Sequence, residues 1–308
     1  MAKALRVRQW VKNLVLFVAI TFAGKLFELP LFLITAHAFL IFCLLSGGIY
    51  LLNDIVDAPK DRLHPFKRHR PIARGTISIP TAFFVSVCFI FTAEASAFLF
   101  FPRPFFLVAM IFLILQLSYT VFLKHITLID VITIASAFIL RIFAGETATG
   151  YHINIWLFLT VISLALFLAL GKRRSELTLL AGGEGLPPKT RETLSHYSEK
   201  MLDVYLSMFS TATWLTYTFY TFLAKPPVLR QTIGNLLDEN LAIVISERKW
   251  LMLTVPLVIY GIMRYLQLIY ERHEGESPEK ILLTDKPLLG TVALWGISVV
   301  FIIYIAGK

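Results

Sequence analysis

Residues 30–61 read "PLFLITAHAFLIFCLLSGGIYLLNDIVDAPKD", and this stretch decides the fold class. Its first part, residues 30–53, contains no Asp, Glu, Lys or Arg. A helix of about 20 apolar residues is long enough to cross a hydrocarbon core about 30 Å thick. The stretch then ends in three aspartates. We therefore expect a membrane-spanning helix whose end carries a cluster of acids.

Similar apolar stretches recur along the whole chain. The 308 residues are 57% hydrophobic and 16% charged, whereas soluble domains average roughly 45–50% and 25%. These values predict an all-α fold, a polytopic membrane helix bundle, with residues 1–308 forming a single integral membrane domain of about nine spans. The spans are expected near residues 13–28, 30–53, 79–100, 104–123, 126–148, 154–171, 198–223, 248–270 and 287–306.

The distribution of basic residues predicts the orientation in the membrane. Of the 29 Lys and Arg residues, 20 fall on the side of the N-terminus and seven on the opposite side, while Arg141 and Arg264 lie inside predicted spans. Short cytoplasmic loops retain positive charge. We expect a multi-pass protein of the cell (inner) membrane with a cytoplasmic N-terminus. Topology and contacts with anionic membrane lipids account for the net charge of +9, so no nucleic acid partner is expected.

The acids at the end of the second span have a spacing that suggests metal binding. Asp54, Asp57 and Asp61 stand at i, i+3 and i+7, which places them on one face of a helix, with Asn53 beside them. We predict that Pro59 breaks the helix, so that Asp61 folds back toward the other two aspartates. Clustered carboxylates are hard oxygen ligands that suit Mg²⁺ shared with substrate phosphates. We therefore predict the three aspartates as catalytic residues and, together with Asn53, as metal ligands, and we expect Asn53 to bind substrate as well.

A basic run follows the acids directly. Arginine forks and lysine point charges bind phosphate oxygens, so acids followed by bases indicate a metal-diphosphate site in which the bases neutralise the leaving group. The alternative is a solvated helix end whose acids pair with Lys60, Arg62 and Lys67. We expect residues 54–78 to form a cytoplasmic active-site loop. The predicted substrate-binding residues of this run are Arg62, Lys67, Arg68 and Arg70.

A second group of polar residues lies at 118–146, "SYTVFLKHITLIDVITIASAFILRIFAGE". Ionisable groups at membrane depth usually face the interior of a bundle or a water-filled cavity. Asp130 and Arg141 are eleven residues apart, which is close to three helical turns and places them on nearly one stripe. We predict that Tyr119, Lys124, Asp130 and Arg141 bind substrate. The alternative for Arg141 is a structural role, with Glu146 as its partner.

A third group is "LALGKRRSEL" at 168–177, where Lys172 and Arg173 are predicted to bind substrate. Taken alone, this pattern is equally typical of a positive-inside anchor. The loops after the second, fourth and sixth spans open on one side, so their charges can converge on one mouth. Residues 172–197 contain Gly and Pro clusters, and we expect them to form a cytoplasmic loop that acts as a lid.

These motifs resemble a known family. The pattern N53-D54-x-x-D57-x-x-x-D61 in a bundle of about nine helices resembles the UbiA-type intramembrane prenyltransferase superfamily. More narrowly, the chain resembles its decaprenyl-phosphate phosphoribosyltransferase branch. The segments that carry this resemblance are "RVRQWVKN" at 6–13, "NDIVDAPKDRLHPFKRHRPIARG" at 53–75, "ILRIFAGE" at 139–146 and "ALGKRRSEL" at 169–177.

The resemblance implies an activity and its substrates. It implies a UbiA-like fold and Mg²⁺-dependent transfer of 5-phosphoribose from 5-phosphoribosyl 1-diphosphate to a polyprenyl (decaprenyl-type) phosphate, with release of diphosphate. Such a reaction would supply cell-wall arabinan synthesis. Lys12, in the first of these segments, is expected to bind substrate as well. A homo-oligomer is left open.

Two other functions compete with this interpretation. A UbiA-type prenyltransferase would use an isoprenyl diphosphate and an aromatic acceptor, and such enzymes typically carry a second D-x-x-x-D-like cluster. Here that region offers only Asp130, behind Lys124, which favours a donor with an additional phosphate. A transporter or channel would distribute its acids through the membrane depth and show internal repeats, whereas the charge here gathers at one surface.

Overall fold

The computed structural model describes residues 4–63, 67–181, 196–224, 249–272 and 278–306. Within these ranges the chain forms helices and no strand, which confirms the predicted all-α bundle. The elements are η1 (Val7–Phe17), α1 (Val18–Phe22), α2 (Leu29–Leu63), η2 (Lys67–His69), α3 (Ile79–Phe100), α4 (Arg103–Val121), η3 (Leu123–His125), α5 (Ile129–Thr149), α6 (Ile155–Ala181), α7 (Glu199–Leu223), η5 (Trp250–Thr254), α10 (Val255–Arg272), α11 (Pro278–Thr284), α12 (Lys286–Val300) and the π-helix η6 (Phe301–Ala306).

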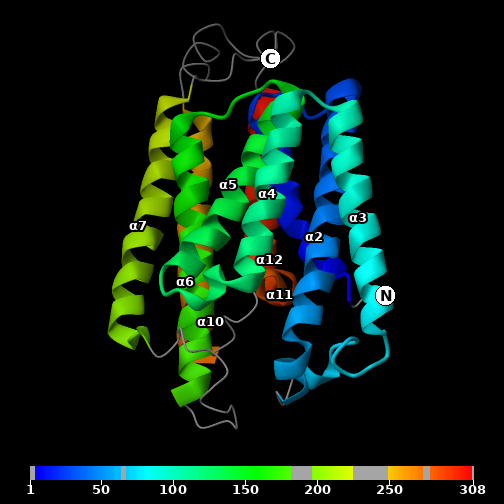
Figure 1. Cartoon of the computed structure of the whole chain (residues 1–308). Coiled ribbons are helices and arrows are strands. Elements are labelled where there is room, and N and C mark those ends of the chain that lie inside the picture. The colour runs from blue at the N-terminus through cyan, green and yellow to red at the C-terminus, as the bar shows by residue number, and fades with distance from the viewer. Residues whose placement is uncertain (1–3, 64–66, 182–195, 225–248, 273–277, 307–308) are drawn as a thin grey trace, which may run out of the picture.

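The long helices run along one common direction and alternate in sense (Figure 1). Helices α2 and α3 pack together on one side of the bundle, and α6 packs with α7 on the other. Helix α5 lies between them and contacts α2, α4, α6 and η1. The order along the chain follows from short connections, which bring consecutive helices side by side as antiparallel neighbours.

Seven helices of the described residues are long and apolar enough to span a membrane: α2, α3, α4, α5, α6, η5 with α10, and α12 with η6. The two other expected spans differ in kind. Residues 13–28 cover the end of η1 and all of α1, which ends at Phe22 before a turn at Gly24, where φ is +72°. Helix α7 has 25 residues, but its sequence is rich in Ser, Thr and Tyr. The protein is therefore a multi-pass membrane protein, and the count of about nine is approximate.

Pro59 does not break the second span, contrary to our prediction. Helix α2 continues through it to Leu63, so all three aspartates stand on one unbroken helix. A proline removes one backbone hydrogen bond, but here only the last turn follows it. Tertiary contacts hold the helix on both sides of Pro59. Ala58 before it packs in a buried cluster with Leu51 and Ile72, and Asp61 after it pairs with Arg70.

The apolar interior consists of two main clusters that meet at α5. One cluster is formed by α2, α3, α4 and α5 around the ring of Phe42, which lies 5.0 Å from that of Phe112 and 6.1 Å from that of Phe105. The other contains Val131 of α5 together with residues of α6, α7 and α10. Because lipid tails are as apolar as these side chains, the clusters hold the spans together mainly by close van der Waals packing. Helix α5 therefore contacts both clusters, and the polar residues on its buried faces must find partners.

Gly145 permits the close approach of α5 and η1. A Cβ atom at this position would lie 2.2 Å from the carbonyl oxygen and 3.1 Å from the Cα of Leu16. Both are backbone atoms, so no side-chain rotation can relieve the overlap. The two segments can pack at this distance only because residue 145 has no side chain.

The Gly145→Ala variant is expected to unfold at a lower temperature, by an amount equivalent to about 1–3 kcal/mol, the usual cost of overpacking. The measurement is the Tm in detergent micelles. Gly290→Ala is the matched control, because Gly290 lies in α12 with nothing within 4 Å of its would-be Cβ. Alanine there should be neutral or stabilising by up to about 1 kcal/mol, as in any helix interior. Equal Tm values for the two variants would contradict the close approach.

Candidate active site

The end of α2 carries a buried group of acids and bases. Asp54 accepts hydrogen bonds from Arg6, at 2.5 Å, and from Arg70, at 3.2 Å. The same Arg70 Nη1 atom lies 2.7 Å from Oδ2 of Asp61. Asp54 and Asp61 are seven residues apart, about 10 Å along the helix axis, and Arg70 bridges them. The side chain of Asp54 is only 3% exposed.

Arg6 reaches this group from the N-terminal segment. Its backbone has φ +49° and ψ +48°, a left-handed conformation that is strained for a residue with a side chain. Its guanidinium also stacks over the Tyr50 ring, 4.9 Å from the centroid. Sequence reasoning placed Arg6 inside a motif without assigning it a role. The contact with Asp54 joins residues 48 positions apart, and no local pattern indicates it.

Asp57 is held by a different base. Its Oδ1 atom accepts a hydrogen bond from Lys124 Nζ at 2.7 Å, and its Oδ2 accepts one from the Asn53 amide at 3.1 Å. Lys124 lies in η3, the short connection between α4 and α5. This contact brings the second motif region onto the first, as predicted from their position on one side of the membrane.

A second pair of opposite charges lies under this connection. The Nε atom of Arg173, in α6, lies 2.6 Å from Oδ2 of Asp130, so the two side chains form an ion pair. The Nε–H bond does not point at this oxygen, so the contact is not a hydrogen bond. It also pairs with Glu176 at 2.5 Å and donates to the Tyr119 hydroxyl at 3.4 Å. Both members of the Asp130–Arg173 pair are at most 2% exposed. Such a pair is costly to desolvate and is stable only because each charge has a partner.

Tyr197 completes this second half of the site, and sequence reasoning missed it. Its hydroxyl donates to Oδ1 of Asp130 at 2.8 Å and accepts from the backbone N–H of Leu128 at 2.8 Å. Burial, together with the hydrogen bond to Asp130, raises the pKa of Tyr197 above its ordinary value, so the phenol is protonated at neutral pH. A tyrosine 67 residues from its partner leaves no signal in the sequence.

The alternative of a solvated helix end does not match these contacts. Asp54 and Asp61 are buried, and the described basic partners of the three aspartates are Arg6 just before η1, Lys124 in η3 and Arg70 after η2. Of the remaining predicted residues, Arg62 donates to the carbonyl of Ala73 at 3.3 Å, Arg68 is exposed, and Lys12 and Lys172 are half-buried. The Lys67 side chain and residues 182–195, which include most of the expected lid, lie outside the described residues.

Arg141 is not in contact with the described residues of this acid and base group. It lies eleven residues beyond Asp130 on α5 and donates to Oδ1 of Asn13 and to the carbonyl of Ala137, both at 2.7 Å. Its guanidinium also lies 4.7 Å from the centroid of the Phe112 ring. These contacts join α5 to η1 and α4. The suggested partner Glu146 is wrong, because that carboxylate accepts from Ile153 N–H at 2.7 Å instead.

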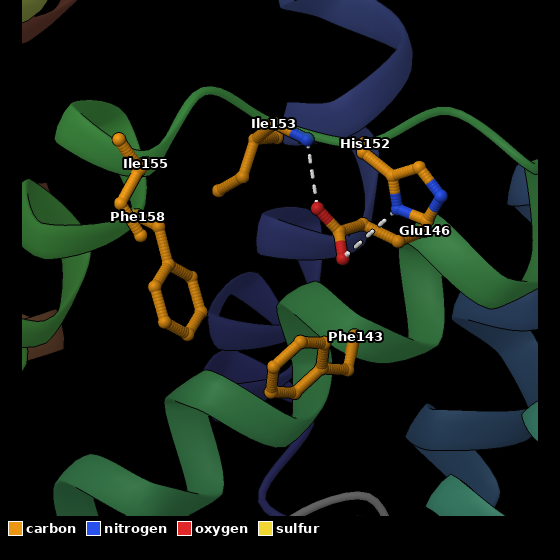
Figure 2. A pocket seen from close by; sticks show the side chains of 6 residues that line it. All are labelled: Phe143, Glu146, His152, Ile153, Ile155 and Phe158. Atoms are coloured by element: carbon orange, nitrogen blue, oxygen red, sulfur yellow. Dashed lines mark hydrogen bonds and ion pairs between the residues drawn. The ribbon is translucent and has the colours of Figure 1, made fainter.

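A pocket of about 310 Å³ lies at the connection between α5 and α6 (Figure 2). This connection is at the end of the bundle opposite to the acids and bases (Figure 1). Oε2 of Glu146 lies 3.7 Å from Nδ1 of His152 there, and Phe143 and Phe158 form apolar walls. Among the residues that the structure describes, no Lys or Arg lines this pocket. A diphosphate would meet a carboxylate without compensation, so we do not place the substrate there.

The acids provide the type of ligand that Mg²⁺ prefers, which is oxygen from carboxylates and an amide. In the described part of the chain, no three His, Cys, Asp or Glu side chains lie close enough together to hold an ion. Instead each aspartate is paired with a base. The carboxylate and amide oxygens fit a hard divalent cation in chemical type. In the structure, however, each of these carboxylates is paired with a basic side chain.

The fold and this site define a class: a membrane-embedded helix bundle with an acid and base cluster at one end, which is suited to a phosphorylated substrate. The model of the UbiA prenyltransferase family matches residues 14–173, more than half of the chain. The chain therefore belongs to the UbiA prenyltransferase family, and it is a membrane-embedded transferase.

Two curated relatives are similar over most of the chain. A decaprenyl-phosphate phosphoribosyltransferase of Corynebacterium glutamicum is 30% identical over 99% of this chain and 87% of its own length. The enzyme of the same name from Mycobacterium tuberculosis is 34% identical over 71% of this chain and 73% of its own length. The predicted resemblance to this branch is thereby confirmed.

A solved structure has the same fold. A UbiA homologue from Archaeoglobus fulgidus, bound to GPP and Mg²⁺, superposes with a TM-score of 0.66 over 98% of both chains. Its sequence identity is 22%, so the likeness concerns the arrangement of the helices.

Proposed function

We propose that this protein transfers 5-phosphoribose from 5-phosphoribosyl 1-diphosphate to a polyprenyl phosphate and releases diphosphate. One observation carries the proposal: every acid of the cluster is paired with a base from a different segment, namely Arg6, Arg70, Lys124 or Arg173. A site with four such bases and a single acid on α5 suits a donor that carries a 5-phosphate besides its diphosphate. The names of the relatives from Corynebacterium and Mycobacterium support the same donor.

The reaction exchanges one bond at the anomeric carbon of the ribose. The bond to the diphosphate oxygen breaks, its electron pair leaves with the diphosphate, and an oxygen of the lipid phosphate forms the new bond. A phosphate monoester is ionised at neutral pH, so no general base is needed. The main contributions of the protein are positioning and the stabilisation of charge on the leaving group.

The residues of the cluster have defined tasks in this proposal. Asn53, Asp54, Asp57 and Asp61 would hold Mg²⁺, which neutralises the leaving diphosphate when bound. The bases would exchange their carboxylate partners for phosphate oxygens, Lys124 leaving Asp57 and Arg70 leaving Asp54 and Asp61. Because acids and bases compensate each other beforehand, neither set remains as an uncompensated buried charge when the site is empty of substrate.

The positive-inside rule supports a site that opens to the cytoplasm, where a water-soluble sugar diphosphate is available. The isoprenoid chain of the acceptor would lie against the apolar helix surfaces in the bilayer. A role in the synthesis of cell-wall arabinan, and a location in the inner membrane, complete the proposal.

The proposal is tested by incubating the purified protein with radiolabelled 5-phosphoribosyl 1-diphosphate, decaprenyl phosphate and Mg²⁺. We expect a labelled lipid to form, and we expect EDTA to abolish its formation because the leaving group then lacks the charge of the metal. A parallel reaction contains a labelled isoprenyl diphosphate and an aromatic acid. Labelled product in that reaction alone would overturn the phosphoribosyl proposal in favour of prenyl transfer.

A further inference from the structure

Tyr197 occupies a position from which it can orient the second half of the site. It lies just before α7, and its ring is buried in the cluster formed by α5, α6, α7 and α10. The ring cannot move without disturbing that packing. Its hydroxyl is therefore held in place at the start of α5, where it accepts one hydrogen bond and donates another.

The hydrogen bond that the hydroxyl accepts comes from a strained turn. Leu128, immediately before α5, has φ +68° and ψ −40°, which is unfavourable for a residue with a branched side chain. This conformation directs its N–H at the Tyr197 hydroxyl, 2.8 Å away. Strained backbone persists only where the surroundings hold it. The hydrogen bond to Tyr197 is one of the contacts that hold the connection between Lys124 and Asp130.

The hydrogen bond that the hydroxyl donates goes to Asp130 itself. Oδ1 of Asp130 accepts two hydrogen bonds, one from the Tyr197 hydroxyl and one from the backbone N–H of Val131, both at 2.8 Å. With Oδ1 occupied in this way, Oδ2 is turned toward Arg173. The orientation of the carboxylate, and thus the position of the Arg173 guanidinium, depends on the phenol.

We propose that Tyr197 is a positioning residue that holds the Leu128 turn and the Asp130 carboxylate in the orientation required for transfer. The inference rests on the proposed function, since it assigns Asp130 and Arg173 to the reacting site. Tyr197 is not expected to touch the substrate. It acts on the reaction through Asp130 and through the turn that also presents Lys124 to Asp57.

The test compares Tyr197→Phe with a matched variant, Tyr217→Phe. Tyr217 is equally buried, and its hydroxyl also makes two hydrogen bonds, one with Thr254 at 2.6 Å and one from Trp295 at 2.8 Å. Both variants should lose similar stability. Only Tyr197→Phe should lower kcat, by roughly 10- to 100-fold, the usual effect of removing a partner that orients a ligand group.

Two further readouts separate positioning from a general loss of structure. In an Asp130→Asn background, Tyr197→Phe should lower kcat by a clearly smaller factor than it does in the wild-type background, because only its effect through the Leu128 turn then remains. The rise of Tm on adding inorganic diphosphate with Mg²⁺ should also be smaller in Tyr197→Phe than in Tyr217→Phe. This measurement requires no transfer, so it decides the inference even where the wild-type protein transfers no phosphoribose.

The inference is overturned if Tyr197→Phe keeps the kcat and the diphosphate response of Tyr217→Phe. It is also overturned if the double variant lowers kcat by the full product of the factors by which Tyr197→Phe and Asp130→Asn lower it singly. A wild-type protein that uses an isoprenyl diphosphate would overturn the proposed function alone, and the same variants would then be compared with that donor.

Discussion

The Asp57→Asn variant is expected to reduce transfer by about 100-fold or more, the size of effect found when a group that stabilises transition-state charge is removed. Asparagine keeps the shape of the side chain and can still bond to Asn53, but it removes the negative charge. Asp57 is the aspartate that the Lys124 ammonium contacts at 2.7 Å. Without that charge, the proposed metal site would lack one ligand, and Lys124 would lose the partner that it contacts in the structure.

This loss should leave the fold intact. The Asp57 and Lys124 side chains are 24% and 12% exposed, and a partly exposed pair contributes about 1 kcal/mol or less. We therefore expect a Tm close to that of the wild type together with a higher requirement for Mg²⁺. The measurements are kcat as a function of Mg²⁺ concentration and the Tm in detergent.

Asp203→Asn is the control for this prediction. Asp203 lies in α7, pairs with Arg174 at 2.8 Å, and has no contact among the described residues with the three aspartates of α2. Its replacement removes the same charge from the same end of the bundle, and activity should stay within about 2-fold, as for a surface pair. Wild-type activity in Asp57→Asn would remove Asp57 from the proposed metal site.

The Arg173→Gln variant is expected to lose about 3–5 kcal/mol of stability, because one partner of a buried ion pair is removed and the other remains charged. Of its partners in the described part of the chain, Asp130 would keep the hydrogen bonds to Tyr197 and Val131. Glu176 would lose its contact with the guanidinium as well. The rate of phosphoribosyl transfer should also fall, because the Arg173 guanidinium is one of the four basic groups that we assign to the phosphates of the donor.

The neighbouring residue provides the control. Arg174 also makes two ion pairs, but its partners Asp203 and Glu199 are 40% and 49% exposed. Solvent can replace Arg174 as the partner of those acids, so Arg174→Gln should cost about 1 kcal/mol or less.

The double variant Arg173→Gln with Asp130→Asn separates stability from catalysis. It removes both buried charges, and replacing a buried pair as a whole is often neutral. We expect most of the stability to return while transfer stays low. A single Arg173→Gln variant as stable as Arg174→Gln would show that Asp130 is not held by this pair.

Much of the fold is predictable from local patterns. The apolar runs predict the positions of α3, α4 and α5 closely, and the aspartate spacing places three acids on one face of α2. The error at Pro59 has a clear cause. A proline destabilises an isolated helix, but the contacts of Ala58 and Asp61 outweigh that local effect, and these contacts involve residues after the helix.

The sequence predicted most of the residues of the candidate site, but only some of the contacts between its acids and bases. Lys124 and Arg173 were predicted from their places in loops on one side of the membrane, and Asp130 as an ionisable group inside a span. Lys124 does contact Asp57 of α2, and Asp130 pairs with Arg173. Arg6 and Tyr197 could not be assigned roles in this way. Each meets its partner across 48 or 67 residues, through a hydroxyl or a strained backbone that no spacing reveals.

The sequence by itself determined the class of the molecule, because the length and charge of an apolar run control whether it can lie in a bilayer. It also supplied the residue types of the proposed site, because acids and bases of these kinds suit metal and phosphate. Only the tertiary structure decided which base meets which acid. That choice depends on how closely the helices approach, as Gly145 allows for α5 and η1, and on the register at which they pack. Both are properties of contacts between distant segments, which periodicity along one helix does not contain.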